Sequence, residues 1–323
     1  MTLRSTLGNW AAWVRDPPPA LVFEISEQSV CLARLGTQSR LPEGLWSSPL
    51  AEGAVEASPI RENVRNAEEL DRALRQVLEQ AGPRGAPIRK KEAAVLLPDN
   101  CARLTILDFE NLPGDAGERL SLIRWRLKKA VPFDVDTASI AYQVQRGAPA
   151  ARGKQEAGRP GSQISVLVAV SPAEVVGQYE AALGRMGLQP GYVSVSVAAA
   201  LNLVAEQGIT MLAKPAGRTL TLAVIDQGQV RLARSLETGA PDRTLTEDTL
   251  REMAADLYPT FVYVADNFGA PVSKLVLAGF GTAFQTAVDV FRRELGCELE
   301  ALKGPQGIVD AASAGIWGFL CGN

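Results

Sequence analysis

The sequence predicts an α/β protein made of two similar lobes. The main observation is a repeat: a strand hairpin that leads into a helix occurs once near each end of the chain, at residues 20–35 and 209–237. The chain has 323 residues, enough for two domains of roughly 150 residues each. Hydrophobic residues make up 46% of it, so each lobe can bury a core of its own.

The first element is an amphipathic helix over residues 2–16, ended by three prolines at 17–19 that cannot continue it. Its two tryptophans suit a membrane interface, and docking on this chain or on a partner is the alternative. The apolar stripe contains Leu3, Leu7, Trp10, Trp13 and Val14.

The first hairpin turns at residues 26–28 and is followed by a helix that Asn66 caps, with Glu69 placed to complete a capping box. Gly82-Pro83 ends that helix, and a buried strand follows at 93–97.

Residues 101–170 predict a strand, a helix, and two more strands. The strands are expected at 102–109, 139–144 and 164–170, and the helix at 116–129. One side of the helix is basic, which usually marks a solvated face, and contact with a partner or with anionic lipid is the alternative. Trp125 is expected in a core or in a contact between subdomains. Residues 146–163 have the Gly/Ala/Pro/Arg composition of a mobile loop.

The rest of the chain predicts a helix begun by Ser171 as cap and Pro172 at the first turn, then three strands with turns at 214–218 and 226–228. The Asp226-Gln-Gly228 turn is interpreted as an ordinary tight turn. A helix over 246–267, a strand at 274–277, a Gly-Phe-Gly turn, a helix over 283–295 and a last apolar segment complete the series.

Composition excludes several classes of site. The chain has no histidine, which removes His general bases, Ser-His-Asp triads and His-ligated metals. Its four cysteines form no C-x-x-C pair, which excludes a zinc ribbon. The net charge of −3 gives no basic excess for nucleic acid. No run of eighteen apolar residues or signal sequence is visible, so a cytoplasmic protein is expected.

The two hairpins and the Gly-x-Gly turn at 279–281 follow the order found in the actin-like ATPase superfamily, which this chain resembles. In that superfamily two hairpin loops hold phosphates between the lobes, and a glycine turn near the C-terminus packs on adenosine. Glycine is needed there so that backbone N–H groups can approach phosphate oxygens, and an aspartate at each hairpin holds the metal.

At finer grain the chain resembles the PilM family of type IV pilus assembly proteins, over residues 20–320. The matching segments are LLPDNCARLTILDFENLP, LIRWRLKKAVPFDVDTASIAYQV, SVLVAVSPAEVVGQYEAALGRMGLQPGYVSV and KLVLAGFGTAFQTAVDVFRRELG. This resemblance implies a two-lobed actin-like, or ribonuclease H-like, α/β fold. Residues 101–170 would be the inserted strand-helix-strand-strand subdomain that also occurs in FtsA.

The resemblance also implies domain boundaries. Residues 1–19 would be the N-terminal helix and Pro linker, 20–87 with 171–205 the first lobe, 88–170 the inserted subdomain, and 206–323 the second lobe. About 34 residues separate Gly239 from Lys274, where the family has a further helical subdomain, so that subdomain is expected to be reduced or missing.

The chain departs from the family where a nucleotide would bind. In the first loop, Ser26 replaces a glycine and Glu27 adds a repelling charge; in the second, Lys214 replaces the aspartate and Pro215 lacks a donor N–H. Phe280 stands between the glycines of the third turn. The degenerate nucleotide-loop positions are Glu24, Ser26, Ser29, Lys214, Gly217, Thr219, Gly279 and Gly281. No catalytic residue, metal site or cofactor is predicted, and ATP with magnesium, the family ligand, is expected to bind weakly or not at all.

The predicted function is a non-catalytic cytoplasmic scaffold of a type IV pilus or related secretion platform, peripheral to the inner membrane. Its implied partners are the cytoplasmic peptide of a PilN-like membrane protein, other pilus assembly components, and the membrane surface through residues 2–16, but no nucleic acid. The alternatives are an active actin-like ATPase or small-molecule kinase, and a GspL-like cytoplasmic domain of type II secretion.

Overall fold

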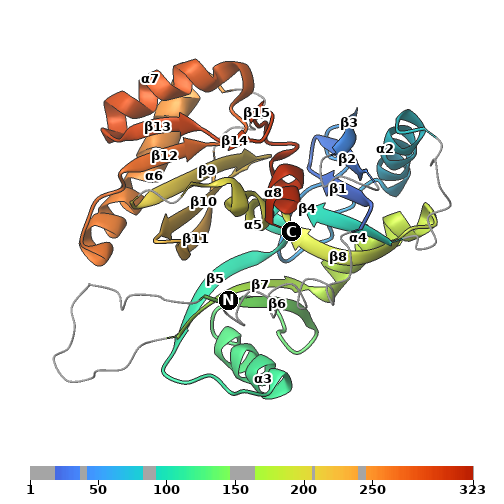
Figure 1. The fold of residues 1–323 in the computed structure, drawn as a ribbon, viewed down its shortest axis with the longest axis horizontal. Helices are drawn as coiled ribbons and strands as arrows, with labels where there is room; N and C mark the ends of the chain where they lie inside the picture. Colours follow the sequence, from blue (N-terminus) through green and yellow to red (C-terminus); the bar gives the residue numbers. More distant parts are fainter. Residues whose placement is uncertain are drawn as a thin grey trace, which may run out of the picture.

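Three β-sheets of three to five strands organise the protein in the computed structural model, and the described residues also form a small two-stranded sheet (Figure 1). The structure describes residues 19–36, 42–82, 92–145, 164–205, 208–238 and 245–322. The expected helix over 2–16 and the whole of the expected loop over 146–163 lie outside these ranges, so those expectations stay predictions. None of the described helices is long and apolar enough to cross a membrane.

The first lobe is built on a five-stranded sheet in the order β3-β2-β1-β4-β8. Its strands are β1 (Leu21–Ile25), β2 (Ser29–Leu35), β3 (Pro42–Pro49), β4 (Glu92–Leu97) and β8 (Gln189–Val195). Both faces are covered: α2 (Ala67–Gln80) and α4 (Ala173–Arg185) bury one, and α5 (Ser196–Ala200) and α8 (Ala314–Gly322) bury the other. Successive β1 residues therefore point alternately into two cores, Phe23 toward α2 and α4 and Val22 toward α8.

One predicted boundary is wrong, because β4 pairs in parallel with both β1 and β8 and so belongs to the first lobe. The placement at 88–170 failed because an apolar run does not reveal which sheet it joins. A short 3₁₀ helix, η1 (Asp99–Cys101), follows β4, and only after it does the chain enter the inserted subdomain.

Two predicted helix starts differ in detail. Asn66 caps α2 by accepting from the Glu69 N–H at 3.1 Å, but the Glu69 carboxylate turns to the Ala51 N–H and to Arg72. Pro172, not Ser171, is the cap residue of α4. The Ser171 hydroxyl instead donates to the Cys101 carbonyl at 2.7 Å, because a buried hydroxyl takes the nearest available acceptor.

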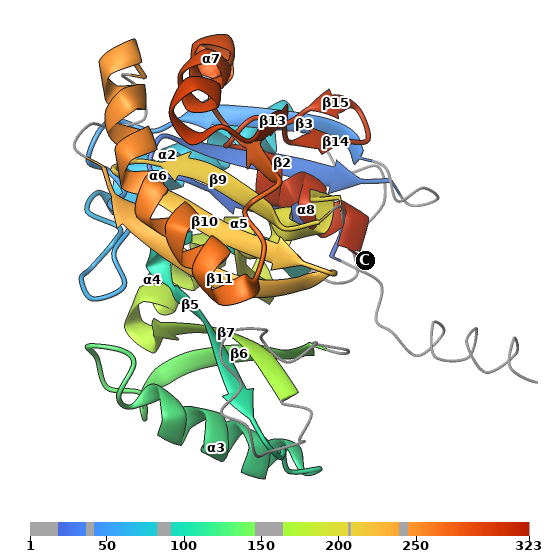
Figure 2. The same cartoon turned by 90° about the vertical axis from the view of Figure 1, so that its left-hand side faces the viewer.

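The second lobe repeats the plan with a five-stranded sheet ordered β11-β10-β9-β12-β13. Its strands are β9 (Thr210–Ala216), β10 (Thr219–Asp226), β11 (Gln229–Glu237), β12 (Lys274–Leu277) and β13 (Glu298–Ala301). Helices α6 (Glu247–Phe268) and α7 (Phe284–Leu295) lie together on one face (Figure 2). α6 is the only described helix between β11 and β12, so the described residues hold no further helical subdomain there.

The chain then returns to the first lobe. A short 3₁₀ helix, η4 (Gly281–Ala283), precedes α7. After β13, the short strands β14 (Lys303–Gly304) and β15 (Gly307–Ile308) lead to α8, which packs on α5 and on β1. Gly318 permits this close approach, since a Cβ there would overlap the Ala199 carbonyl group. Another short segment, η2 (Leu201–Leu203), follows α5.

The inserted subdomain, here residues 103–172, is a three-stranded sheet ordered β5-β7-β6 with α3 on its outer face (Figures 1 and 2). Its elements are β5 (Arg103–Phe109), α3 (Ala116–Leu127), β6 (Ala138–Gln145) and β7 (Ile164–Pro172). Ile123 and Leu127 of α3 are buried in its core, but Trp125 is 63% exposed, so its predicted burial is wrong. Its neighbours Ile123 and Leu127 already fill the inward face.

Candidate functional site

The two lobes meet where the first and second hairpins turn. A cavity of about 40 Å³ lies there, lined from the first lobe by residues 24–28, Ala57, Pro98, Asp99 and Ser196, from the second by residues 214–217, and by Ala311 and Ala312. We call it the inter-lobe cavity. The structure thus brings together Glu24, Ser26, Lys214 and Gly217 of the predicted positions, whereas Ser29, Thr219, Gly279 and Gly281 do not line this space.

Glu24 is the next-to-last residue of β1, and its carboxylate is buried on the side that faces α5 and α8. Ser196 Oγ donates to Glu24 Oε1, and two backbone N–H groups at the N-terminus of α8 donate to the carboxylate, Gly315 at 3.3 Å and Ile316 at 2.9 Å. Burial raises the pKa of this carboxyl above its ordinary 4.5, against the lowering effects of Lys214 and these donors. Glu24 is therefore committed to internal contacts.

Lys214 lies in strand β9, not in the predicted turn, because β9 pairs with β10 as far as Ala216 opposite Thr219. Its ammonium Nζ is 2.8 Å from Asp99 Oδ2, and the two side chains are 4% and 0% exposed. Asp99 Oδ1 also accepts the Val197 N–H of α5 at 2.7 Å. A buried ion pair therefore joins the first lobe to the second.

The first turn is closed by its own serine. Ser26 Oγ accepts the N–H groups of Gln28 and Ser29 at 3.2 and 3.0 Å, and the hydroxyl donates to the Ser29 carbonyl at 3.1 Å. These amides would be the ones to face a phosphate in a glycine loop, and the Ser26 side chain already satisfies two of them.

The second turn is occupied by a carboxylate of the first. Gly217 has φ = +61°, and a Cβ on it would overlap the Glu27 carboxylate. Glu27 Oε1 accepts the Ala57 N–H at 2.7 Å. Gly217 therefore permits close approach, as a phosphate loop requires, but the anion that approaches belongs to the chain itself. Thr219 stays local, its hydroxyl donating to the Ala216 carbonyl at 2.9 Å.

The third turn packs rather than opens. Gly279 has φ = +86° and lies against Ala311, leaving no room for a Cβ. Phe280 is buried among second-lobe residues and meets Phe291 edge to face. Gly281 begins η4 with φ = +47°. Phe280, which stands where the family usually has glycine, is thus part of the hydrophobic core of the second lobe.

Sequence reasoning missed Asp99 and Ser196 as members of this site. Asp99 follows a buried strand and a proline, a turn position whose polar side chain can reach a neighbouring strand end. That signal was present but did not reveal its partner. Ser196 carried no local signal, since it is brought to Glu24 only by the pairing of β8 with β4.

The inter-lobe cavity is much smaller than a nucleotide pocket, and the cavity beside it is rich in carboxylates. Small-molecule pockets hold about 300–1,000 Å³, far more than the inter-lobe cavity. A larger neighbouring cavity of about 460 Å³ has four carboxylates in its lining, those of Glu27, Glu52, Glu56 and Glu237, and only two guanidiniums, those of Arg61 and Arg218. Excess negative charge repels polyphosphate. Among the described residues no three acidic or cysteine side chains gather as a metal site.

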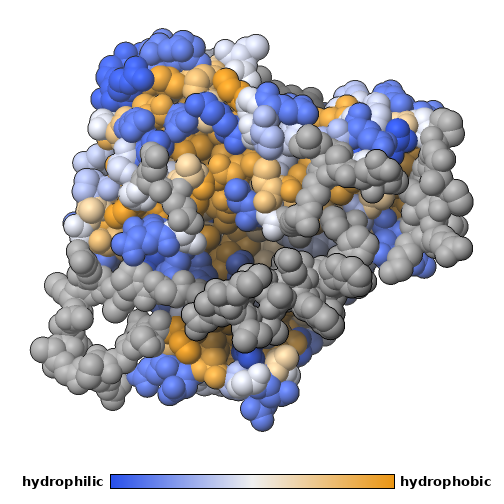
Figure 3. All heavy atoms as spheres, viewed as in Figure 1, coloured by the Kyte–Doolittle hydropathy of each residue, from blue (hydrophilic) through white to orange (hydrophobic). Residues whose placement is uncertain are grey.

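A second cleft of about 240 Å³ lies beside the inserted subdomain, and we call it the subdomain groove. All three parts of the protein line it. The first lobe and the segment that follows it contribute Pro59, Asp99, Asn100 and Ala102, the inserted subdomain contributes Arg103, Leu104, Pro132 and Phe133, and the second lobe contributes Thr221, Ala233, Arg234 and Ser235. Its β5 and β11 walls are edge strands of their sheets. The space-filling view shows hydrophilic side chains along the outer rim of the second lobe and apolar ones toward the middle of the molecule (Figure 3).

Comparison with known structures agrees with this architecture. The structure of a PilM-PilN type IV pilus biogenesis complex aligns with TM-score 0.73 at 16% identity, covering 94% of this chain and 98% of that one. A protein of unknown function from Bacteroides thetaiotaomicron, described as having an actin-like ATPase fold, aligns with TM-score 0.51 at 10% identity over 86% and 89%. The chain has the actin-like ATPase fold. This confirms the predicted fold class, with its inserted subdomain.

Sequence comparison gives no family assignment. No protein-family model matches the chain, and no curated protein matches it either. The cytoplasmic domain of EpsL, an inner-membrane component of the Vibrio cholerae type II secretion system, is similar only at TM-score 0.44 and 14% identity, over 80% of each chain. That likeness is too low to support an argument.

Proposed function

We propose that this actin-like chain is a non-catalytic scaffold of a type IV pilus or related secretion platform, and that it binds the cytoplasmic peptide of a PilN-like membrane protein. The observation that carries the proposal is the inter-lobe cavity: its space, its cation and its carboxylates are all used by the chain's own contacts. The structural likeness to the PilM-PilN complex supports the choice of partner.

The subdomain groove has the composition of a peptide site. Leu104, Phe133 and Ala233 supply apolar surface to the groove, and Asn100, Arg103, Arg234 and Ser235 supply polar groups. Grooves of this kind hold apolar side chains in the centre and meet peptide carbonyls with donors at the rim. The two edge strands add main-chain groups along the same cleft.

The proposal is tested with a labelled synthetic peptide that spans the cytoplasmic N-terminal residues of a PilN-like protein from the same organism. Fluorescence anisotropy should show saturable binding, and Phe133→Ala should weaken it by about tenfold or more, because a central aromatic anchor is lost. Tyr258→Ala, an exposed aromatic on α6 outside the groove, is the matched control and should bind normally. Equal binding by all three proteins would contradict the groove assignment.

Phosphate release in millimolar Mg-ATP tests the non-catalytic part. The expected result is no release above the protein-free rate and no thermal shift, since loss of preorganised donors and metal carboxylates costs orders of magnitude in rate. Turnover that depends on magnesium would establish the ATPase or kinase alternative instead. Gene neighbours of the type II secretion system, with no PilN-like gene, would favour the GspL-like alternative.

A further inference from the structure

Asp99 belongs to two sites at once, since it lines both the inter-lobe cavity and the subdomain groove. We infer that the Asp99–Lys214 ion pair is a built-in clamp that holds the two lobes in one closed arrangement and thereby sets the width of the subdomain groove. In actin-like ATPases a nucleotide lies between the lobes, whereas in this chain the Asp99–Lys214 pair lies there. The effect on peptide affinity rests on the proposed function; the clamp itself does not.

The pair has the geometry of a clamp. Asp99 sits in η1 at the end of first-lobe strand β4, and Lys214 sits in second-lobe strand β9. Their 2.8 Å contact is buried on both sides, so water and salt do not screen it as they screen surface pairs. The second oxygen of Asp99 is held by the Val197 N–H, which prevents the carboxylate from following Lys214 if the lobes part.

A further contact closes the same interface. The Glu27 carboxylate of the first hairpin lies against Gly217 of the second, where any side chain would displace it. On the other side of the molecule, the Gln145 side chain of the inserted subdomain exchanges two hydrogen bonds with the Val230 backbone of β11, at 2.8 and 2.9 Å. These two hydrogen bonds therefore hold the inserted subdomain against β11 of the second lobe.

The groove depends on this arrangement because its walls come from both lobes. Asn100 lies in the first lobe and Phe133 in the inserted subdomain, whereas Thr221 and Ala233 lie on the second-lobe sheet. A rotation of one lobe against the other changes the distance between those walls. Two-lobed proteins commonly open and close about a hinge, and here a buried charge pair opposes the opening motion. The groove is thus kept formed without a nucleotide.

The test is a distance measurement between the lobes in the full chain, without any peptide. Spin labels are placed on exposed helix positions, at Glu79→Cys on α2 and Thr286→Cys on α7, after Cys297 and Cys321 are changed to Ser. Pulsed electron resonance should give one narrow distance distribution that millimolar Mg-ATP leaves unchanged. In the double variant Asp99→Asn/Lys214→Met the distribution should broaden or shift. The amide oxygen that Asp99→Asn introduces can still accept from Val197, so the double variant leaves neither member of the pair as an unpaired buried charge, and it serves even if the single Lys214→Met protein fails to fold.

The matched control is Lys274→Met/Glu300→Gln, which removes a lysine–carboxylate pair at 3.0 Å within the second-lobe sheet. It should keep the native distribution. An unchanged distribution in the Asp99→Asn/Lys214→Met protein, or an equal change in the control, would overturn the clamp. If the peptide binds, the double variant should bind it on the order of tenfold more weakly, a usual size for coupling between sites. A protein that shows the distance change but never binds peptide would refute the proposed function and leave the clamp standing.

Discussion

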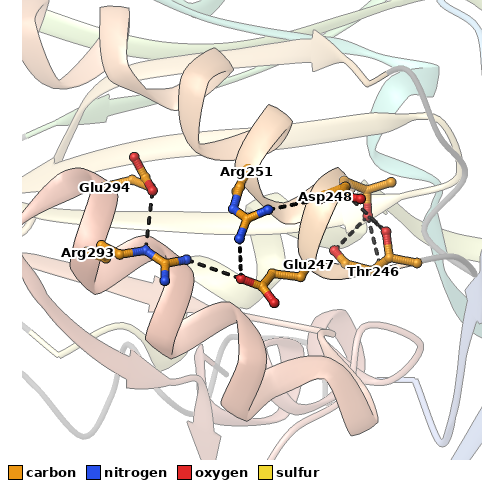
Figure 4. A network of polar contacts seen from close by, with 7 residues as sticks. Thr246, Glu247, Asp248, Arg251, Arg293 and Glu294 are labelled. Atoms are coloured by element: carbon orange, nitrogen blue, oxygen red, sulfur yellow. Dashed lines mark hydrogen bonds and ion pairs between the residues drawn. The ribbon is translucent and has the colours of Figure 1, made fainter.

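Two ion-pair systems in this protein use the same chemistry in opposite surroundings. On the surface of the second lobe, Arg251 pairs with Glu247 and Asp248, while Arg293 reaches Glu247 and Glu294 at 3.4 Å (Figure 4). The two arginines and Glu247 are about half exposed. The Asp99–Lys214 pair, by contrast, is almost entirely closed to solvent.

The difference teaches that burial, rather than the number of contacts, decides what an ion pair does. An exposed ion pair adds little to the free energy of unfolding, because each charge gives up contacts with water to form it. The α6–α7 network therefore adds only modest stability to two helices that already share a core. A buried pair need not add net stability either, but each partner makes the other necessary. It therefore fixes one arrangement of the lobes.

The largest expected effect comes from breaking the buried pair on one side. Lys214→Met should lower the free energy of unfolding by about 3–5 kcal/mol, because Asp99 is left charged in a site without solvent. Urea denaturation measures this change. The double variant Asp99→Asn/Lys214→Met should recover much of the loss, and a double variant less stable than Lys214→Met would contradict this account.

A smaller effect is expected from the buried acid next to that pair. Because the folded-state pKa of Glu24 is raised, the folded protein keeps a proton that the unfolded chain releases, so Glu24 makes stability fall as pH rises from its ordinary pKa of 4.5. Denaturation midpoints of the native protein and Glu24→Gln, compared across that range, isolate the effect. The difference between them should shift steadily in favour of Glu24→Gln as pH rises. A difference independent of pH would show that burial does not perturb this carboxyl.

The smallest effect is expected on the exposed network. Arg251→Ala should change the free energy of unfolding by less than about 1 kcal/mol, and added salt should shrink even that. Thermal unfolding at low and high ionic strength provides the measurement. A loss as large as that of Lys214→Met would mean that exposure is not what separates the two systems.

Sequence reasoning located the hairpins and most helices because their apolar periods and caps are local signals. The strands at 210–237 and the cap at Asn66 were predictable from a few neighbouring residues. The environment of Lys214 was not, because whether a strand residue faces an aspartate 115 positions away depends on how two sheets meet. The exposure of Trp125 was missed for a similar reason, since a helix can offer more apolar residues than its core can take.

The same limit applied to the candidate site. The departures of Ser26, Lys214 and Phe280 from a nucleotide site were visible in the sequence as residue types. The contacts that take the ligand's place were not visible, because Asp99, Ser196 and the start of α8 come from three distant segments.

The return of α8 to the first lobe has a consequence for synthesis. Ile316, which donates to Glu24, lies 292 residues after it in the chain. At about 5–20 residues per second, the ribosome synthesises α8, the last part of the first lobe's core, roughly 15–60 s after β1. Until then Val22 and Leu96 have no α8 to cover them, and the Glu24 carboxylate has no helix end to bind. The first lobe is begun early and completed late, so one face of its sheet stays uncovered until translation has passed α8.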